Sequence, residues 1–233
     1  MKRVAIALFG GSGERFGSSE PKQFIMLGDA PMMVVTLRGL SACPEVDEIY
    51  VAAKPDTMEK THQLISEYHI RKVKAIIPGG KSREESVYAA LAYLNRVRLD
   101  FDDLVLIQDG DRPNVDPEIV KENYETAFHY EAAVTALPAT DSIIYSELGL
   151  EVNSYKARPT IYYAQTPQTF RFGLILRCFD HVRRHKKLDM FTDDGSLVKS
   201  CGHKVKIVPG KKSNVKITTK LDLAMYFEGR LHL

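Results

Sequence analysis

The chain has 233 residues, 44% of them hydrophobic, which is enough for one sizeable α/β domain but short for two. Its 32 basic and 30 acidic residues leave a formal charge of +2, which argues against a general nucleic-acid or membrane-surface binder. Three scattered cysteines form no C-x-x-C pair, so a disulfide framework and a zinc ribbon are both unexpected. This cysteine usage fits a reducing cytoplasm best. No run approaches the roughly 20 apolar residues of a membrane span.

Strands and helices are predicted to alternate as far as Pro138. Apolar runs bounded by Gly, Pro or charged residues predict strands, and stretches of helical periodicity lie between them. The expected strands are Val4–Phe9, Glu48–Ala53, Val73–Ile77, Leu104–Gln108 and Ala132–Leu137, and the expected helices are Met32–Ala42, Thr57–Tyr68, Arg83–Arg96 and Pro117–Tyr130. This alternation predicts a Rossmann-like, doubly wound, mostly parallel sheet that binds ligands beyond the carboxyl ends of its strands.

The pattern changes after Pro138. Ser142–Ser146 and Thr160–Gln165 resemble strands with no helix between them, which predicts a hairpin projecting from the sheet as an arm of about residues 139–165. Regular order then returns, with helices at Gly173–Arg183 and Asp194–Cys201, a strand at Lys204–Val208 and a closing helix at Lys220–Leu231. We therefore expect a single domain over residues 1–233 that carries one β-arm.

A glycine-rich loop follows the first predicted strand. Gly10-Gly11-Ser12-Gly13 is followed by Arg15, Gly17 and Lys22, so backbone N–H groups and two cations are available to phosphates. The third glycine comes one residue late for a dinucleotide fingerprint, and no Gly-Lys-Ser/Thr ends the run as in a Walker loop. A nucleotide-phosphate site is favoured, with a plain strand-to-helix turn as the alternative.

Polar groups also follow the later strands. Gly79–Ser86 opens a helix with Ser82 as a predicted N-cap and Glu85 completing a capping box, whether or not the loop also binds a ligand. Asp109 comes at the end of the next expected strand, where it is placed to hold a divalent cation, although a turn with an ion pair to Arg112 is the alternative. Lys216, flanked by apolar residues, is placed to meet a third phosphate.

The sequence contains no G-x-S-x-G elbow and no H-E-x-x-H motif, and its seven histidines have no metal-ligand spacing. Several cations with one or two carboxylates are typical of direct transfer between phosphates, where catalysis consists of positioning and charge neutralisation. No covalent intermediate is needed.

Taken together in chain order, these motifs resemble those of the cytidylyltransferases typified by 2-C-methyl-D-erythritol 4-phosphate cytidylyltransferase, including the related ribitol-5-phosphate enzymes. The resemblance covers almost the whole chain. It rests on Gly11-Ser12-Gly13-Glu14-Arg15-Phe16-Gly17, Pro21-Lys22-Gln23, Gly79-Gly80 with Arg83 and Ser86, Asp109 with Arg112-Pro113, Asp141-Ser142, Gln165-Thr166-Pro167-Gln168, Thr192-Asp193-Asp194 and Asn214-Val215-Lys216-Ile217-Thr218. It implies a nucleotide-diphospho-sugar transferase fold in a single nucleotidyltransferase domain.

The resemblance also implies a role for each matching position. The implied catalytic cations are Arg15, Lys22 and Lys216. The implied nucleotide-binding residues are Leu8, Phe9, Gly10, Gly11, Gly13, Gly80, Arg83, Ser86 and Asp109. The implied acceptor-binding residues are Asp109, Arg112, Ser142, Arg158, Thr166 and Thr192. Asp109 would hold Mg²⁺, and the arm would come from the other subunit of a homodimer.

The implied reaction transfers CMP from CTP to 2-C-methyl-D-erythritol 4-phosphate, a step in making isoprenoid precursors. Ribitol 5-phosphate is the alternative acceptor, and a nucleotide-binding regulator without turnover is a third reading. Phe9-Gly10-Gly11 stands in place of the two alanines frequent in the methylerythritol enzymes, which favours the ribitol branch slightly. Gly110-Asp111 replaces the usual small or apolar pair, which would add a second carboxylate to the metal site. Ser142 takes the place of the family's Thr, and Asp194 takes the place of its Glu.

Overall fold

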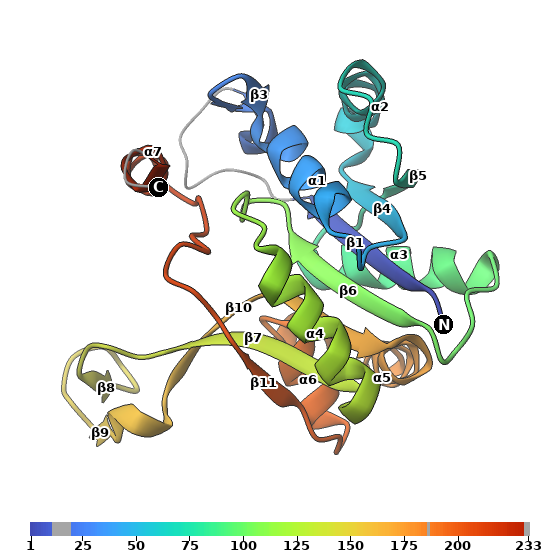
Figure 1. Ribbon diagram of the computed structural model, residues 1–233. Coiled ribbons are helices and arrows are strands. Elements are labelled where there is room, and N and C mark those ends of the chain that lie inside the picture. The colour runs from blue at the N-terminus through green and yellow to red at the C-terminus, as the bar shows by residue number, and fades with distance from the viewer. Residues whose placement is uncertain (11–19, 186, 231–233) are drawn as a thin grey trace.

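The computed structural model describes residues 1–10, 20–185 and 187–230 (Figure 1). Gly11, Gly13 and Arg15 of the predicted phosphate loop lie outside these residues. A seven-stranded sheet with the order β11-β7-β10-β6-β1-β4-β5 forms the centre of the molecule. Its strands are β1 (Arg3–Phe9), β4 (Glu48–Ala53), β5 (Val73–Pro78), β6 (Leu104–Asp109), β7 (Ala132–Pro138), β10 (Tyr162–Arg171) and β11 (Lys206–Pro209). Only β10 among these seven runs antiparallel to its neighbours, so the mostly parallel sheet is confirmed.

Helices cover both faces of this sheet (Figure 1). The first face packs against α1 (Met32–Ala42), α2 (Met58–Glu67) and α4 (Pro117–Tyr130). The second packs against α3 (Arg83–Arg96), α5 (Phe172–Arg184) and α6 (Asp194–Ser200). The last helix, α7 (Lys220–Arg230), joins a smaller cluster through Tyr226. The doubly wound α/β architecture follows.

The alternation of side chains along β1 explains why both faces are covered. Val4, Ile6 and Leu8 enter the core under α3 and α5, whereas the residues between them enter the core under α1 and α4. A strand that is apolar on both sides is stable only where both sides are buried. The unbroken apolar run that predicts this strand therefore also requires the two helical layers.

Short elements connect the larger ones. Two short strands, β2 (Met26–Leu27) and β3 (Ala30–Pro31), form a small hairpin. The 3₁₀ helices are η2 (Lys22–Phe24), η3 (Pro55–Thr57), η4 (Arg158–Thr160) and η5 (Leu188–Met190). No helix in the described ranges is long and apolar enough to cross a membrane.

The arm differs from its prediction in one strand. It pairs β8 (Ile143–Tyr145) with β9 (Ser154–Lys156), so the prediction that Thr160–Gln165 forms the second hairpin strand is wrong. That segment instead begins β10, which runs between β7 and β6 in the main sheet. The segment forms a strand as its pattern predicts, but its partner is β7 of the main sheet, and Pro167 is accommodated where the β10–β7 register shifts, between Ala164 and Gln168.

The strand order places the site. The chain runs from β1 outward to β4 and β5, then crosses back to β6 on the other side of β1. The loops after β1 and β6 therefore lead away toward opposite edges of the sheet. The crevice between their carboxyl ends is the topological switch point, where α/β sheets bind ligands. Gly110 allows the two ends to approach closely: its N–H donates to the Leu8 carbonyl at 2.9 Å, and a Cβ there would lie 2.3 Å from the Phe9 ring.

Candidate active site

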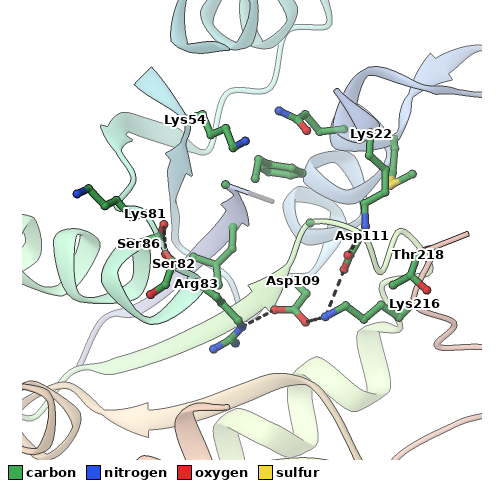
Figure 2. Close-up of a pocket in the computed structure, with 16 residues that line it drawn as sticks. Lys22, Lys54, Lys81, Ser82, Arg83, Ser86, Asp109, Asp111, Lys216 and Thr218 are labelled. Carbon is green, nitrogen blue, oxygen red and sulfur yellow. Dashed lines mark hydrogen bonds and ion pairs between the residues drawn. The ribbon is translucent and has the colours of Figure 1, made fainter. Parts of the chain in front are cut away.

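A cavity of about 490 Å³ opens at this switch point (Figure 2). It is bounded by the ends of β1 and β6, the start of α3, and the segment before α7. Its lining residues are Leu8, Phe9, Gly10, Lys22, Gln23, Met32, Lys54, Lys81, Ser82, Arg83, Ser86, Asp109, Gly110, Asp111, Lys216 and Thr218. Residues far apart in the sequence thus meet at one place, as expected when ligands bind beyond the carboxyl ends of parallel strands.

The start of α3 forms one wall of the cavity. Ser82 caps the helix by accepting a hydrogen bond from the Glu85 N–H at 3.1 Å, which confirms the predicted cap. The Glu85 carboxylate reaches back to the N–H of Lys81 at 2.6 Å, one residue before the cap. Ser86 Oγ accepts from the Gly80 N–H at 3.1 Å and donates to the Ser82 carbonyl at 2.8 Å. The loop is thereby fixed against a helix N-terminus, whose dipole favours anions.

Arg83 joins two buried carboxylates. Its Nε donates to Asp109 Oδ1 at 3.0 Å, and its two terminal nitrogens hold Asp194 at 3.1 and 2.7 Å. The Asp194 side chain is fully buried, and that burial raises the pKa of its carboxyl although Arg83 opposes the shift. The guanidinium therefore connects the end of β6 to the first turn of α6.

Asp109 has a second cationic partner. Lys216 Nζ donates to Asp109 Oδ2 at 2.8 Å, so both carboxylate oxygens are paired. Burial alone would raise the pKa of the Asp109 carboxyl, but Arg83 and Lys216 outweigh it and hold that pKa well below its usual range. Asp109 is thus ionised throughout the physiological pH range.

A second carboxylate lies beside the first. Asp111 Oδ2 accepts from Lys22 Nζ at 2.7 Å, and Asp111 Oδ1 lies 3.9 Å from Lys216 Nζ. Figure 2 shows the lysines from two distant segments converging on Asp109 at the end of β6 and Asp111 just after it. The end of one strand therefore supplies a negative charge for each of the two predicted catalytic lysines.

The segment that carries Lys216 is held by buried polar contacts. Arg112, which is buried, donates to the Asn214 carbonyl at 2.7 Å, and the Asn214 amide donates to the Thr166 carbonyl at 2.8 Å. The Ile217 N–H donates to the Asp111 carbonyl at 2.8 Å. Arg112 and Thr166, both expected at the acceptor, do not line the cavity in a single chain.

The remaining acceptor positions lie elsewhere. Ser142 and Arg158 are exposed on the arm, and Thr192 is exposed just before α6. None of the three lines the cavity. Thr166 does touch the site indirectly, because its Oγ1 accepts from the Asp109 N–H at 3.0 Å. The cavity thus contains the predicted nucleotide side of the site, and the predicted acceptor side is spread beyond it.

Sequence reasoning assigned no role to several residues that line the cavity, namely Gln23, Met32, Lys54, Lys81 and Thr218. Lys54 directly follows the strand Glu48–Ala53, so the same rule that found Asp109 points to it. Lys81 and Thr218 belong to loops that were recognised. Met32 opens a helix, and no local signal distinguishes it from a core residue.

The family model for 2-C-methyl-D-erythritol 4-phosphate cytidylyltransferase (IspD) matches residues 4–227. The enzyme of that name from Thermosipho africanus is 37% identical over 221 residues, covering 94% of each chain. The one from Clostridium botulinum (strain Loch Maree / Type A3) is 34% identical over 225 residues, 96% of this chain and 95% of the relative. The chain belongs to the 2-C-methyl-D-erythritol 4-phosphate cytidylyltransferase family.

Solved structures agree with this membership. The crystal structure of the Francisella tularensis 2-C-methyl-D-erythritol 4-phosphate cytidylyltransferase superimposes with a TM-score of 0.81 at 27% identity, covering all of both chains. The family model and the named relatives all carry the methylerythritol name. They do not support the lean toward the ribitol branch that Phe9-Gly10-Gly11 suggested.

We expect Asp194→Asn to lower the free energy of unfolding by about 3–5 kcal/mol, because it removes one of the two buried carboxylates that pair with the guanidinium of Arg83. Urea unfolding of the full chain measures this. The control is Glu125→Gln, which breaks the exposed pair with Lys121 and should cost about 0.5 kcal/mol at most. Equal losses in the two variants would contradict a structural role for the buried pair.

Proposed function

We propose that this chain transfers CMP from CTP to 2-C-methyl-D-erythritol 4-phosphate and releases pyrophosphate. The observation that carries the proposal is the convergence of Lys22 and Lys216 on Asp109 and Asp111 in a cavity at the switch point, in a member of this family. Two cations held beside carboxylates suit a reaction in which both substrates are anions.

The proposed chemistry is an in-line displacement. A phosphate oxygen of the acceptor attacks the α-phosphorus of CTP, the bond from that phosphorus to the bridging oxygen breaks, and the electron pair leaves with pyrophosphate. Because negative charge meets negative charge, lysine amines near the transferred group lower the barrier by neutralisation. Lys22 and Lys216 are proposed for this role, together with Arg15.

Mg²⁺ is the proposed cofactor, held by Asp109. The donor set fits, since a carboxylate oxygen is a hard ligand and Asp109 lines the cavity. Within the described ranges, no three His, Cys, Asp or Glu side chains gather around one point, so phosphate oxygens would complete the coordination. Bound there, the ion would neutralise and orient the triphosphate.

The preference for CTP over purine nucleotides is proposed to come from the shape of the cavity. The base would lie between the end of β1 and the Gly79–Ser86 loop, where backbone groups are available to a cytosine edge and the close approach of Gly10 to Ser86 leaves little depth for a purine. A regulator without turnover is less consistent with Lys22, Asp109 and Lys216 all being present in the cavity. The cytoplasm is the proposed compartment, where the three free thiols stay reduced.

The arm is proposed to complete a homodimer. A two-stranded hairpin is marginal by itself in water, and the arm, together with the start of β10, exposes a set of large apolar side chains. These are Ile144, Tyr145, Leu148, Leu150, Val152, Tyr155, Tyr162 and Tyr163. Packing against a second copy would cover them and bring Arg158 and Ser142 to the partner's cavity.

An assay of pyrophosphate release tests the substrate assignment. We expect turnover with CTP and 2-C-methyl-D-erythritol 4-phosphate, at least tenfold slower turnover with ribitol 5-phosphate, and weak activity with ATP or GTP in place of CTP. A faster rate with ribitol 5-phosphate would replace the proposed acceptor. Equal rates with CTP and ATP would refute the proposed pyrimidine pocket.

Mixed dimers test the shared site. Lys22→Ala should lower kcat by about 10²–10³, as removal of one transition-state donor does, and Arg158→Ala should also be inactive. When the two variants are mixed and re-dimerised, activity should return, because one site of each heterodimer has an intact cavity and an intact arm.

The control pair is Lys22→Ala with Lys216→Ala. Both lysines line the cavity of the same chain, so every site of that heterodimer has one defect and no activity should return. Recovery in neither mixture, with heterodimers verified by mass, would mean that Arg158 acts within its own chain or not at all.

A further inference from the structure

Asp111 holds a predicted catalytic lysine in a tight, largely buried ion pair. The distance from Lys22 Nζ to Asp111 Oδ2 is 2.7 Å, and the two side chains are only 14% and 17% exposed. Screening by solvent is weak at such burial, so the attraction is stronger than in an exposed pair. Lys22 is therefore paired with a protein carboxylate in this structure.

The same carboxylate also faces the second lysine. Asp111 Oδ1 is buried, accepts no hydrogen bond from the residues that the structure describes and lies 3.9 Å from Lys216 Nζ (Figure 2). The backbone of Asp111 is fixed, because its carbonyl accepts from the Ile217 N–H at 2.8 Å. The carboxylate is thus held between the two amines that the reaction uses.

Other cations of the cavity differ from this pair. In the part of the chain that the structure describes, the ammonium groups of Lys54 and Lys81 line the same cavity without an ion-pair or hydrogen-bond partner. An incoming polyanion meets these amines without displacing anything. Lys22 becomes available only when its bond to Asp111 is exchanged for one to a phosphate.

We propose that Asp111 is an internal competitor of the phosphates, a residue that holds Lys22 before phosphates bind, yields it to them and takes it back as pyrophosphate leaves. The proposal rests on the proposed function, because it assumes that Lys22 binds the phosphates of the nucleotide. Its effect is to weaken the binding of every polyanion, so that retention depends more on the base and acceptor contacts and the product leaves more readily.

Calorimetric titration of the full chain with inorganic pyrophosphate in EDTA tests the exchange. Asp111→Asn keeps the shape and removes the charge, so we expect pyrophosphate to bind about tenfold tighter, equal to about 1.4 kcal/mol. The control is Asp102→Asn, which breaks an ion pair of 2.8 Å with Arg171 near the start of β6, at the end of the strand away from the cavity. The affinity of this variant for pyrophosphate should stay within about twofold of that of the parent chain.

A double-mutant cycle with Lys22→Gln separates exchange from simple repulsion. If Asp111 acts by holding Lys22, Asp111→Asn should strengthen pyrophosphate binding by no more than about threefold once Lys22 is absent. A full tenfold gain in the Lys22→Gln background would overturn the exchange. An unchanged or weaker affinity of Asp111→Asn in the parent background would overturn it as well.

The titration is repeated with Mg²⁺. Tighter binding of the magnesium complex by Asp111→Asn supports the competitor role, whereas weaker binding would overturn it and make Asp111 a metal ligand. Melting curves verify folding, and Asp111→Ala, which also removes the carboxylate, replaces the amide variant if that one does not fold.

Pyrophosphate has neither a base nor an acceptor, so this result is separate from the substrate assignment. A gain in affinity together with no turnover of CTP and 2-C-methyl-D-erythritol 4-phosphate would refute the proposed function alone. Turnover of those substrates without the gain in affinity would refute the role of Asp111 alone.

Discussion

The arrangement of the cavity depends on one buried carboxylate between two cations. Asp109 ends the central strand β6 and accepts from Arg83 on one oxygen and Lys216 on the other. Arg83 in turn holds the fully buried Asp194, so α3, β6, α6 and the segment before α7 meet through charge-assisted hydrogen bonds. Such groups are costly to bury unless all are paired, which restricts the site to one arrangement of these four segments.

The sheet explains why those segments meet. Because β6 lies beside β1 although more than ninety residues separate them in the chain, the loops after both strands open at the same edge. Two apolar layers keep the strands in place, and the charged contacts of the cavity lie at the end of β6 and in the segments around it. Stability thus comes from the layers, whereas the function that we propose comes from the loops.

Most of the fold could be predicted because its signals are local. Strands such as Val4–Phe9 are unbroken apolar runs, and the Ser82 cap depends on residues within one turn. The strand β9 could not be predicted, since its three residues Ser154–Lys156 are polar or exposed and their pairing with β8 is all that defines it. The course of β10 depends on its two neighbours in the sheet.

The site was predictable to the same extent. Asp109, Lys22 and Lys216 follow from the rule that loops after parallel strands meet, but no local pattern reveals that Arg83 bridges to Asp194 or that Asp111 holds Lys22, because those contacts span 111 and 89 residues. The most direct test of the central claim is the magnesium dependence of CTP turnover in Asp109→Asn, with folding verified by its melting curve. We expect the rate to fall by about 10²–10³-fold and to depend less on the magnesium concentration than in the parent chain. An unchanged rate and an unchanged titration would show that Asp109 only closes a turn.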